Sequence, residues 1–111
     1  MHELAIAESI MHLALSHAAG RRVTGVGVKV GALRQVVPES LSFSFDLVVQ
    51  GTLAEGARLE IEGVEAAGVC GRCGAESRIV AFPLRCDHCG ELGLEVVRGE
   101  ELYVQWVEVE E

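Results

Sequence analysis

The first hydrophobic pattern in the chain is helical. Apolar residues recur at three- and four-residue steps through residues 4–19: Leu4, Ala7, Met11, Ala14 or Leu15, and Ala18. Gly20 follows at the C′ position, where glycine is common. We therefore expect an amphipathic helix over residues 4–19.

Three segments are predicted to be main strands, the first two because apolar and polar residues alternate along them. The alternating segments are residues 23–30 and 57–62, and the third predicted strand, residues 102–107, is rich in apolar and aromatic residues. In the first of them, Val26, Val28 and Val30 fall on one face, as in a half-buried strand. We expect these segments to share one sheet.

Residues 38–50 fit two patterns. Alternation from Leu41 to Leu47 favours a strand. Pro38 and Gly51, however, suit the first turn and the end of a helix, and Leu41 and Phe45 also have helical spacing, as does Val48. The pattern alone leaves helix and strand open.

The segment 67–98 separates the last two main strands and contains every cysteine. Cys70 and Cys73 form one Cys-x-x-Cys pair, and Cys86 and Cys89 form a second pair after twelve intervening residues. Two such pairs complete a tetrahedron of sulfurs, which suits Zn²⁺, with iron as the usual competitor. Three nearby glycines permit the positive-φ turns that such a site needs: Gly71, Gly74 and Gly90.

Few apolar residues lie in this segment, so its rigidity should come from the metal. We expect residues 78–82 to be β-prone and the alternation of Leu92, Leu94 and Val96 to form a last short strand. The predicted domains are residues 1–66 plus 99–111, and an inserted module at residues 67–98.

Two other interpretations of the cysteines are alternatives to a zinc site: disulfides and a redox-active dithiol. Disulfides need an oxidising compartment, yet Glu3 and Glu8 stand where a signal peptide would carry basic residues. A redox dithiol would explain one pair and leave the other idle. The pattern therefore favours a closed Zn(Cys)₄ site in a reduced, cytoplasmic protein.

Composition narrows the function further. Half of the 111 residues are hydrophobic, no apolar run reaches the length of a membrane span, and the net charge is −8. Nucleic-acid binding draws on Lys and Arg, but Lys29 is the single lysine. Arg72, Arg78 and Arg85 cluster near the cysteines, where they are as easily explained as compensation for thiolate charge. Protein partners or metal cations suit this chain better than DNA or RNA.

The N-terminal sequence Met1-His2-Glu3 suggests a second metal site. If Met1 is retained, its α-amine has an unperturbed pKa of about 7.7–8.0, low enough for a metal to displace the proton. The amine, the His2 backbone nitrogen and the His2 imidazole are nitrogen donors that suit Ni²⁺ or Cu²⁺. The alternative is a histidine that is simply solvated.

Together, these motifs resemble the HypA/HybF family of nickel metallochaperones in [NiFe]-hydrogenase maturation. The resemblance covers essentially the whole chain, in order: Met1-His2-Glu3-Leu4, Val30-Gly31-Ala32-Leu33, Val37-Pro38-Glu39-Ser40-Leu41, Phe43-Ser44-Phe45, Gly51-Thr52 and the paired knuckles. One departure is Asp87, where many members have proline, which bears on the local knuckle geometry and on the role of His88.

The resemblance implies an α+β fold in which two helices pack on a three-stranded sheet, with an inserted zinc-ribbon-like Zn(Cys)₄ module. It also implies that residues 38–50 are helical. Met1, His2 and Glu3 would bind nickel, with His2 essential and Glu3 contributing its backbone nitrogen or its carboxylate. The zinc ligands would be Cys70, Cys73, Cys86 and Cys89.

The function implied by the resemblance is transfer of Ni(II), not catalysis. A HypB-type GTPase would be the partner and the [NiFe]-hydrogenase large subunit the recipient, and some members also serve urease. The sequence contains no Walker-type glycine loop, so GTP hydrolysis would belong to the partner. The rival hypotheses are a zinc-ribbon nucleic-acid or protein-binding adaptor and a thiol oxidoreductase.

Overall fold

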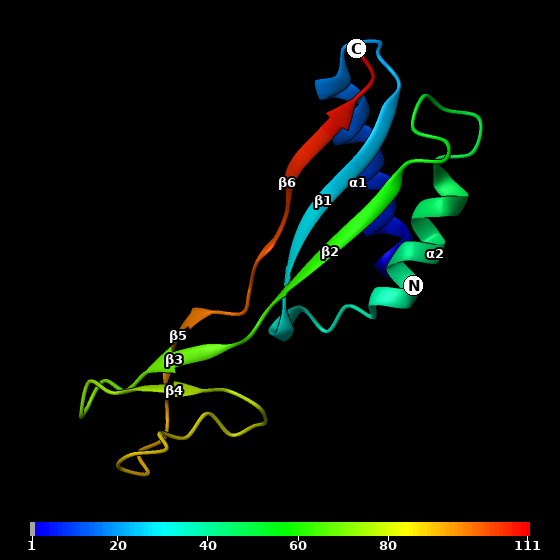
Figure 1. The fold of residues 1–111 in the computed structure, drawn as a ribbon. Coiled ribbons are helices and arrows are strands. Elements are labelled where there is room, and N and C mark those ends of the chain that lie inside the picture. The colour runs from blue at the N-terminus through cyan, green and yellow to red at the C-terminus, as the bar shows by residue number, and fades with distance from the viewer. Residues whose placement is uncertain (1) are drawn as a thin grey trace. The chain divides into compact units, whose positions relative to one another are not determined.

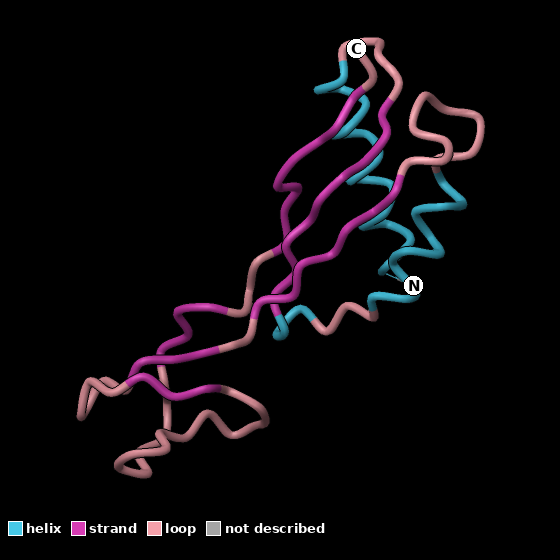
Figure 2. The backbone as a smooth tube through the Cα atoms, in the orientation of Figure 1, coloured by secondary structure: helices cyan, strands magenta, loops and turns pink. Residues whose placement is uncertain are grey.

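The computed structural model of the chain describes residues 2–111. Its elements, shown in Figures 1 and 2, are α1 (His2–Ala18), β1 (Val23–Gly31), the 3₁₀ turn η1 (Ala32–Arg34), α2 (Pro38–Val48), β2 (Arg58–Val64), β3 (Ala67–Val69), β4 (Glu76–Arg78), β5 (Glu95–Arg98) and β6 (Leu102–Val109). They form two compact units. Among the described residues, no helix is long and apolar enough to cross a membrane.

The first unit comprises the N-terminal segment through Lys29 together with Val36–Glu62 and Leu102–Glu111. Its sheet has the order β2-β1-β6, and α1 and α2 cover one face (Figure 1). β1 therefore lies in the centre, which explains why its side chains are the most continuously buried of the three strands. This arrangement confirms the α+β prediction of two helices on a three-stranded sheet.

Helix α1 follows its predicted face with one exception. Ala7, Met11 and Ala18 are buried as expected, but Leu4 is 41% exposed and its neighbour Glu3 is buried instead. The Glu3 carboxylate accepts a hydrogen bond from the backbone N–H of Val37, just before α2. That hydrogen bond offsets the free-energy cost of burying the carboxylate. Glu3 therefore faces the interior, and the expected Leu4 does not.

The ambiguous segment is helical, as the family resemblance implied. Its buried residues Leu41, Phe45 and Val49 recur at steps of four, whereas Val48 is only partly buried. The alternation that suggested a strand is misleading, because Phe43 is 66% exposed and Leu47 is 47% exposed. Pro38 lies at the start of the helix, where its missing N–H has no intrahelical role.

Two phenylalanines on α2 provide a test of this packing. Phe45 is fully buried, so Phe45→Ala should lower the free energy of unfolding by about 3–5 kcal/mol. Phe43→Ala deletes the same atoms from an exposed position and should change it by less than about 0.5 kcal/mol. Urea unfolding of the two variants checks the difference, and equal losses would mean that Phe43 is packed as Phe45 is.

The second unit comprises Val30–Gln35 and Gly63–Glu101. Its sheet has the order β4-β3-β5, and β3 pairs antiparallel with both neighbours. The buried core consists of Ala66, Cys70, Ile79, Cys86 and Leu94, with Leu33, Leu84 and Val96 packed around it. Leu33 belongs to η1, whose contribution to this core was not predicted from the sequence.

Two strands in this unit have bounds that differ from the predicted ones. Residues 78–82 were expected to be β-prone, but β4 is Glu76–Arg78 and the chain bends at residues 81–83. Ile79 still donates its N–H to the Ala66 carbonyl; beyond it the chain leaves the sheet. Leu92 makes only an isolated bridge to Arg85, and the last strand is β5, Glu95–Arg98.

Candidate metal centre

The four cysteine sulfurs converge on one point in the second unit. All four lie within 4.8 Å of one another. The Sγ atoms of Cys70 and Cys89 are 3.6 Å apart, and those of Cys73 and Cys86 are 3.7 Å apart. Sulfurs at these distances are not bonded as disulfides, which contradicts the disulfide alternative. Four Zn–S bonds of about 2.3 Å at tetrahedral angles would separate the sulfurs by about 3.8 Å, so the cluster fits the metal.

The two Cys-x-x-Cys knuckles are built alike. The N–H of Gly74 donates to the Cys70 carbonyl at 2.9 Å, and the N–H of Gly90 donates to the Cys86 carbonyl at 3.0 Å. Both glycines have positive φ, 76° and 79° respectively, as the sequence predicted. Gly71, which was predicted to share this role, does not have positive φ. Short-range turns therefore aim each pair of thiols, independently of the rest of the chain.

Backbone N–H groups point at one sulfur in each knuckle. The N–H groups of Arg72 and Cys73 lie 3.4 Å from Cys70 Sγ. Those of His88 and Cys89 lie 3.3 and 3.5 Å from Cys86 Sγ. Such donors favour the thiolate, which is the form that binds metal.

The pKa values follow these contacts. The Cys89 N–H, followed by that of His88, lowers the pKa of Cys86 to about 6, against burial that opposes it. The Cys73 N–H, followed by that of Arg72, lowers the pKa of Cys70. In Cys89, the N–H of Glu91 also lowers the pKa, but burial and the neighbouring thiols outweigh it and raise the pKa to about 11. These contacts favour the thiolate form of Cys86 and Cys70, and a divalent cation would favour ionisation of the other two thiols.

The guanidinium groups of the three arginines near the knuckles make no hydrogen bond to the sulfurs; each has another partner. Arg72 pairs with Glu91 at 3.3 Å, and Arg78 pairs with Glu65 at 3.2 Å. Arg85 donates to the Gly90 carbonyl at 2.8 Å. Within the described chain, the hydrogen-bond donors to sulfur outside the cysteine side chains are backbone N–H groups and the Ser77 hydroxyl. The arginines are therefore surface features, and direct compensation of thiolate charge is not their role here.

At the other predicted site, the structure describes His2 and Glu3, whereas Met1 lies outside the described residues. His2 is the first residue of α1, and its side chain is 56% exposed. Its Nε2 lies 3.5 Å from a carboxylate oxygen of Glu3. That same oxygen accepts the Val37 N–H at 3.1 Å, which is the main cause of the lowered Glu3 pKa. His2 thus presents an accessible imidazole beside an anion that is anchored to the start of α2.

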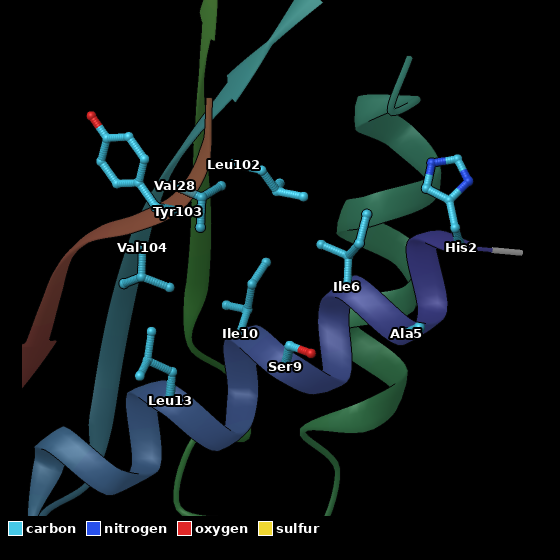
Figure 3. Close-up of a pocket in the computed structure, with 10 residues that line it drawn as sticks. All are labelled: His2, Ala5, Ile6, Ser9, Ile10, Leu13, Val28, Leu102, Tyr103 and Val104. Carbon is cyan, nitrogen blue, oxygen red and sulfur yellow. The ribbon is translucent and has the colours of Figure 1, made fainter. Parts of the chain in front are cut away.

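An apolar pocket of about 350 Å³ borders His2. Figure 3 shows its walls between α1 and β6, with Ile6, Ile10 and Leu13 on the helix facing Leu102 and Val104 on the strand. His2 stands at the N-terminal end of this row. No sequence motif pointed to the pocket, because it depends on which strand lies beside α1.

The remaining histidines do not extend either site. His12 and His17 are exposed on α1, and His88 is exposed within the second knuckle. Among residues 2–111, the four cysteines are the one group of three or more His, Cys, Asp or Glu side chains placed to share a metal. The structure therefore gives no support to a further multi-residue site built on these histidines.

The fold and the cysteine cluster define a small α+β protein with four cysteines placed to share one metal ion. A family described as "Hydrogenase/urease nickel incorporation, metallochaperone, hypA" matches residues 1–109, and the chain belongs to this HypA family. This confirms the family resemblance drawn from the sequence.

Several relatives share nearly the full length of the chain. The "Hydrogenase maturation factor HypA" of Geobacter sp. (strain M21) is 46% identical over 110 residues, covering 99% of this chain and all of the relative. That of Crocosphaera subtropica is 40% identical over 111 residues, covering 100% and 97% respectively.

Solved structures share the fold. The solution structure of the Ni metallochaperone HypA from Helicobacter pylori has a TM-score of 0.64 at 19% identity and covers 96% of each chain. A second solution structure, titled HypA protein, has a TM-score of 0.67 at 22% identity, covering 98% of this chain and 96% of the other. At such identities the likeness concerns the fold alone.

Proposed function

We propose that this protein is a nickel metallochaperone that binds Ni(II) at Met1, His2 and Glu3 and delivers it to the [NiFe]-hydrogenase large subunit. The observation that carries the proposal is the exposed imidazole of His2 at the start of α1. Membership of a nickel-incorporation family supports the choice of metal. A HypB-type GTPase is the proposed partner, and urease maturation proteins are further candidates.

The proposed nickel ligands are the α-amine of Met1, the backbone nitrogen of His2 and the His2 imidazole. Helix α1 begins at His2, and the first N–H groups of a helix have no intrahelical carbonyl partner, so binding there disrupts no helical hydrogen bond. The Glu3 carboxylate already holds the Val37 N–H. That contact favours the backbone nitrogen as the Glu3 contribution, with the carboxylate holding the site against α2.

The cysteine centre has a different proposed role. Cys70, Cys73, Cys86 and Cys89 would hold Zn(II), which would supply the cross-link that keeps the inserted module folded. We assign residues 67–98 to this module and residues 1–66 plus 99–111 to the nickel domain. A closed set of four sulfurs leaves no open coordination position, so the zinc site suits structure and not metal transfer.

Transfer by ligand exchange requires no catalytic group from this chain, and we propose that it is not an enzyme. Cu²⁺ binds nitrogen ligands more tightly than Ni²⁺, so affinity alone cannot select the cargo. Selection would come from site geometry, from copper scarcity in the proposed cytoplasmic setting and from the partner proteins.

Nickel titration of chains with free and blocked N-termini tests the proposal. An N-terminal extension removes the α-amine of Met1 and should abolish stoichiometric Ni²⁺ binding in calorimetry, while bound zinc stays unchanged. The same extension placed at the C-terminus is the control and should leave nickel binding intact. Equal nickel binding by both tagged chains would exclude the N-terminal site.

A further inference from the structure

The loop between the two knuckles has an unusual surface for this protein. Val80 is 79% exposed and Phe82 is 69% exposed, more than any other large hydrophobic side chain described. The segment 78–85 also begins and ends with arginine and contains no acidic residue, although the whole chain has a net charge of −8. Exposed apolar groups framed by one sign of charge are typical of an interaction surface.

The loop itself forms most of the wall of an open cavity in the second unit. This cavity, of about 230 Å³, is lined by apolar side chains that include Ile79, Leu84 and Leu94, and by the polar residues Arg78 and Arg85. One carboxylate, Asp87, also borders it, so the charge of the lining is net positive by one. The cavity is large enough for one or two apolar side chains of a bound segment.

The base of the loop is held by the knuckles. Cys86 follows Arg85 directly, its N–H bonds to the Glu91 carbonyl, and the N–H of Gly93 bonds to the Leu84 carbonyl. Arg85 is itself fixed by its bond to Gly90. The C-terminal end of the loop is therefore ordered before binding, and that part loses less conformational entropy when a partner binds.

We infer that residues 78–85, here called the knuckle loop, bind an acidic, apolar segment of a partner protein. Apolar side chains of the segment would enter the cavity and cover Phe82. Its carboxylates would pair with Arg78, in competition with Glu65, and with Arg85, which would keep its bond to the Gly90 carbonyl. Aromatic residues and arginine are the side chains that most often dominate binding energy at such surfaces. The inference rests on the proposed function, since it assigns partner docking to the zinc module and nickel to the other unit.

A protein segment fits better than an anionic membrane. Two arginines are fewer basic residues than membrane-binding segments usually carry, and the net charge of −8 opposes attraction to an anionic lipid surface. A cavity that admits individual side chains also suits a peptide more than a planar headgroup layer. Vesicle binding is therefore the competing outcome in the test.

The test uses the zinc-loaded full chain and fluorescently labelled short peptides. One peptide is rich in Glu and Leu, and the second replaces every Glu with Lys. We expect the acidic peptide to bind at least about tenfold more tightly, measured by fluorescence anisotropy. Equal affinity for the two peptides, or tighter binding of the basic one, would overturn the inference.

Charge-matched variants locate the binding surface. Arg78→Glu with Arg85→Glu should weaken binding of the acidic peptide at least about tenfold. Arg21→Glu with Arg22→Glu makes the same change in net charge on the first unit and should weaken it much less. Equal losses in the two double variants would show that net charge, and not the knuckle loop, attracts the peptide.

An apolar pair and a lipid probe complete the test. Phe82→Ser should weaken peptide binding at least about fivefold, whereas Phe43→Ser, at a similarly exposed position on α2, should not. Phosphatidylglycerol vesicles should not bind; vesicle binding that depends on Arg78 and Arg85, without peptide binding, would replace the inference with a membrane site. Zinc content confirms that each variant is folded.

Nickel titration of the same variants separates this inference from the proposed function. Phe82→Ser should bind Ni²⁺ as the unaltered chain does. If the unaltered chain bound no nickel, only the nickel proposal would be refuted, because peptide binding to the knuckle loop is measured without nickel.

Discussion

Replacement of Cys86 with serine should release zinc and unfold residues 63–101 while the first unit stays folded. Cys86 is 2% exposed and belongs to a core of only five buried residues, two of which are cysteines. A structural zinc contributes on the order of 10–16 kcal/mol to the folding of small modules. Loss of one sulfur therefore removes more free energy than so small a core can replace.

Two measurements check the Cys86 prediction. Metal analysis should find about one zinc per unaltered chain and little in Cys86→Ser. Hydrogen exchange should show lost protection at the β3 amides Gly68 and Val69, with α1 unchanged. Ser77→Ala is the matched control, because Ser77 is also buried and its hydroxyl contacts Cys86 Sγ at 3.9 Å without belonging to the proposed ligand set. That variant should keep its zinc.

A Cys86→Ser chain that retained zinc and its exchange protection would contradict the structural role of the metal. Unfolding of the whole chain would contradict the independence of the two units. We expect the second unit alone to unfold. The first unit should stay folded because it has its own core of buried residues from α1, α2 and β1.

The cysteine cluster was predictable because its geometry is local. Each knuckle is a short turn closed by a bond from Gly74 to Cys70 or from Gly90 to Cys86, so spacing alone nearly specifies where the thiols point. The two cysteine pairs come together provided that the residues between Cys73 and Cys86 bring the chain back to the first knuckle. By contrast, the cavity at the knuckle loop depends on how residues 78–87 bend back on themselves and meet Leu94, and no spacing or periodicity in the sequence specifies that bend.

In helix α2, the hydrophobic pattern alone does not determine the secondary structure or the buried face. Alternation and helical spacing were both present because apolar residues occupied more positions than the core could bury. Phe43 and Leu47 satisfied the strand pattern yet are exposed, and packing of α2 against α1 selected Leu41 and Phe45 instead. The sequence of α2 alone cannot reveal which face meets α1.

The N-terminus has one feature that the sequence predicts and one that depends on long-range packing. The nitrogen donors of His2 could be proposed from its position in the chain. The inward turn of Glu3 could not, because its partner is the Val37 N–H, 34 positions away. This contact adds a reason for Glu3 to follow His2, since the carboxylate connects the start of α1 to the start of α2.

His2→Ala should abolish stoichiometric Ni²⁺ binding and leave zinc in place. The substitution removes the imidazole and leaves only an amine and backbone nitrogens, which form a much weaker chelate near neutral pH because the amide nitrogen must lose its proton. His2 is exposed and alanine favours helices, so α1 should remain folded. Calorimetric titration with nickel, alongside zinc analysis and circular dichroism, measures all three expectations.

Two matched variants make the result specific to His2. His12→Ala removes an exposed histidine from the same helix and should bind nickel normally. Glu3→Gln keeps the backbone nitrogen and an oxygen acceptor for the Val37 N–H, so it should also retain stoichiometric binding, within about tenfold in affinity. If Glu3→Gln lost nickel as completely as His2→Ala, the carboxylate would be a direct ligand. If His2→Ala retained stoichiometric binding, the proposed site would be wrong, and nickel would have to be sought elsewhere on the chain.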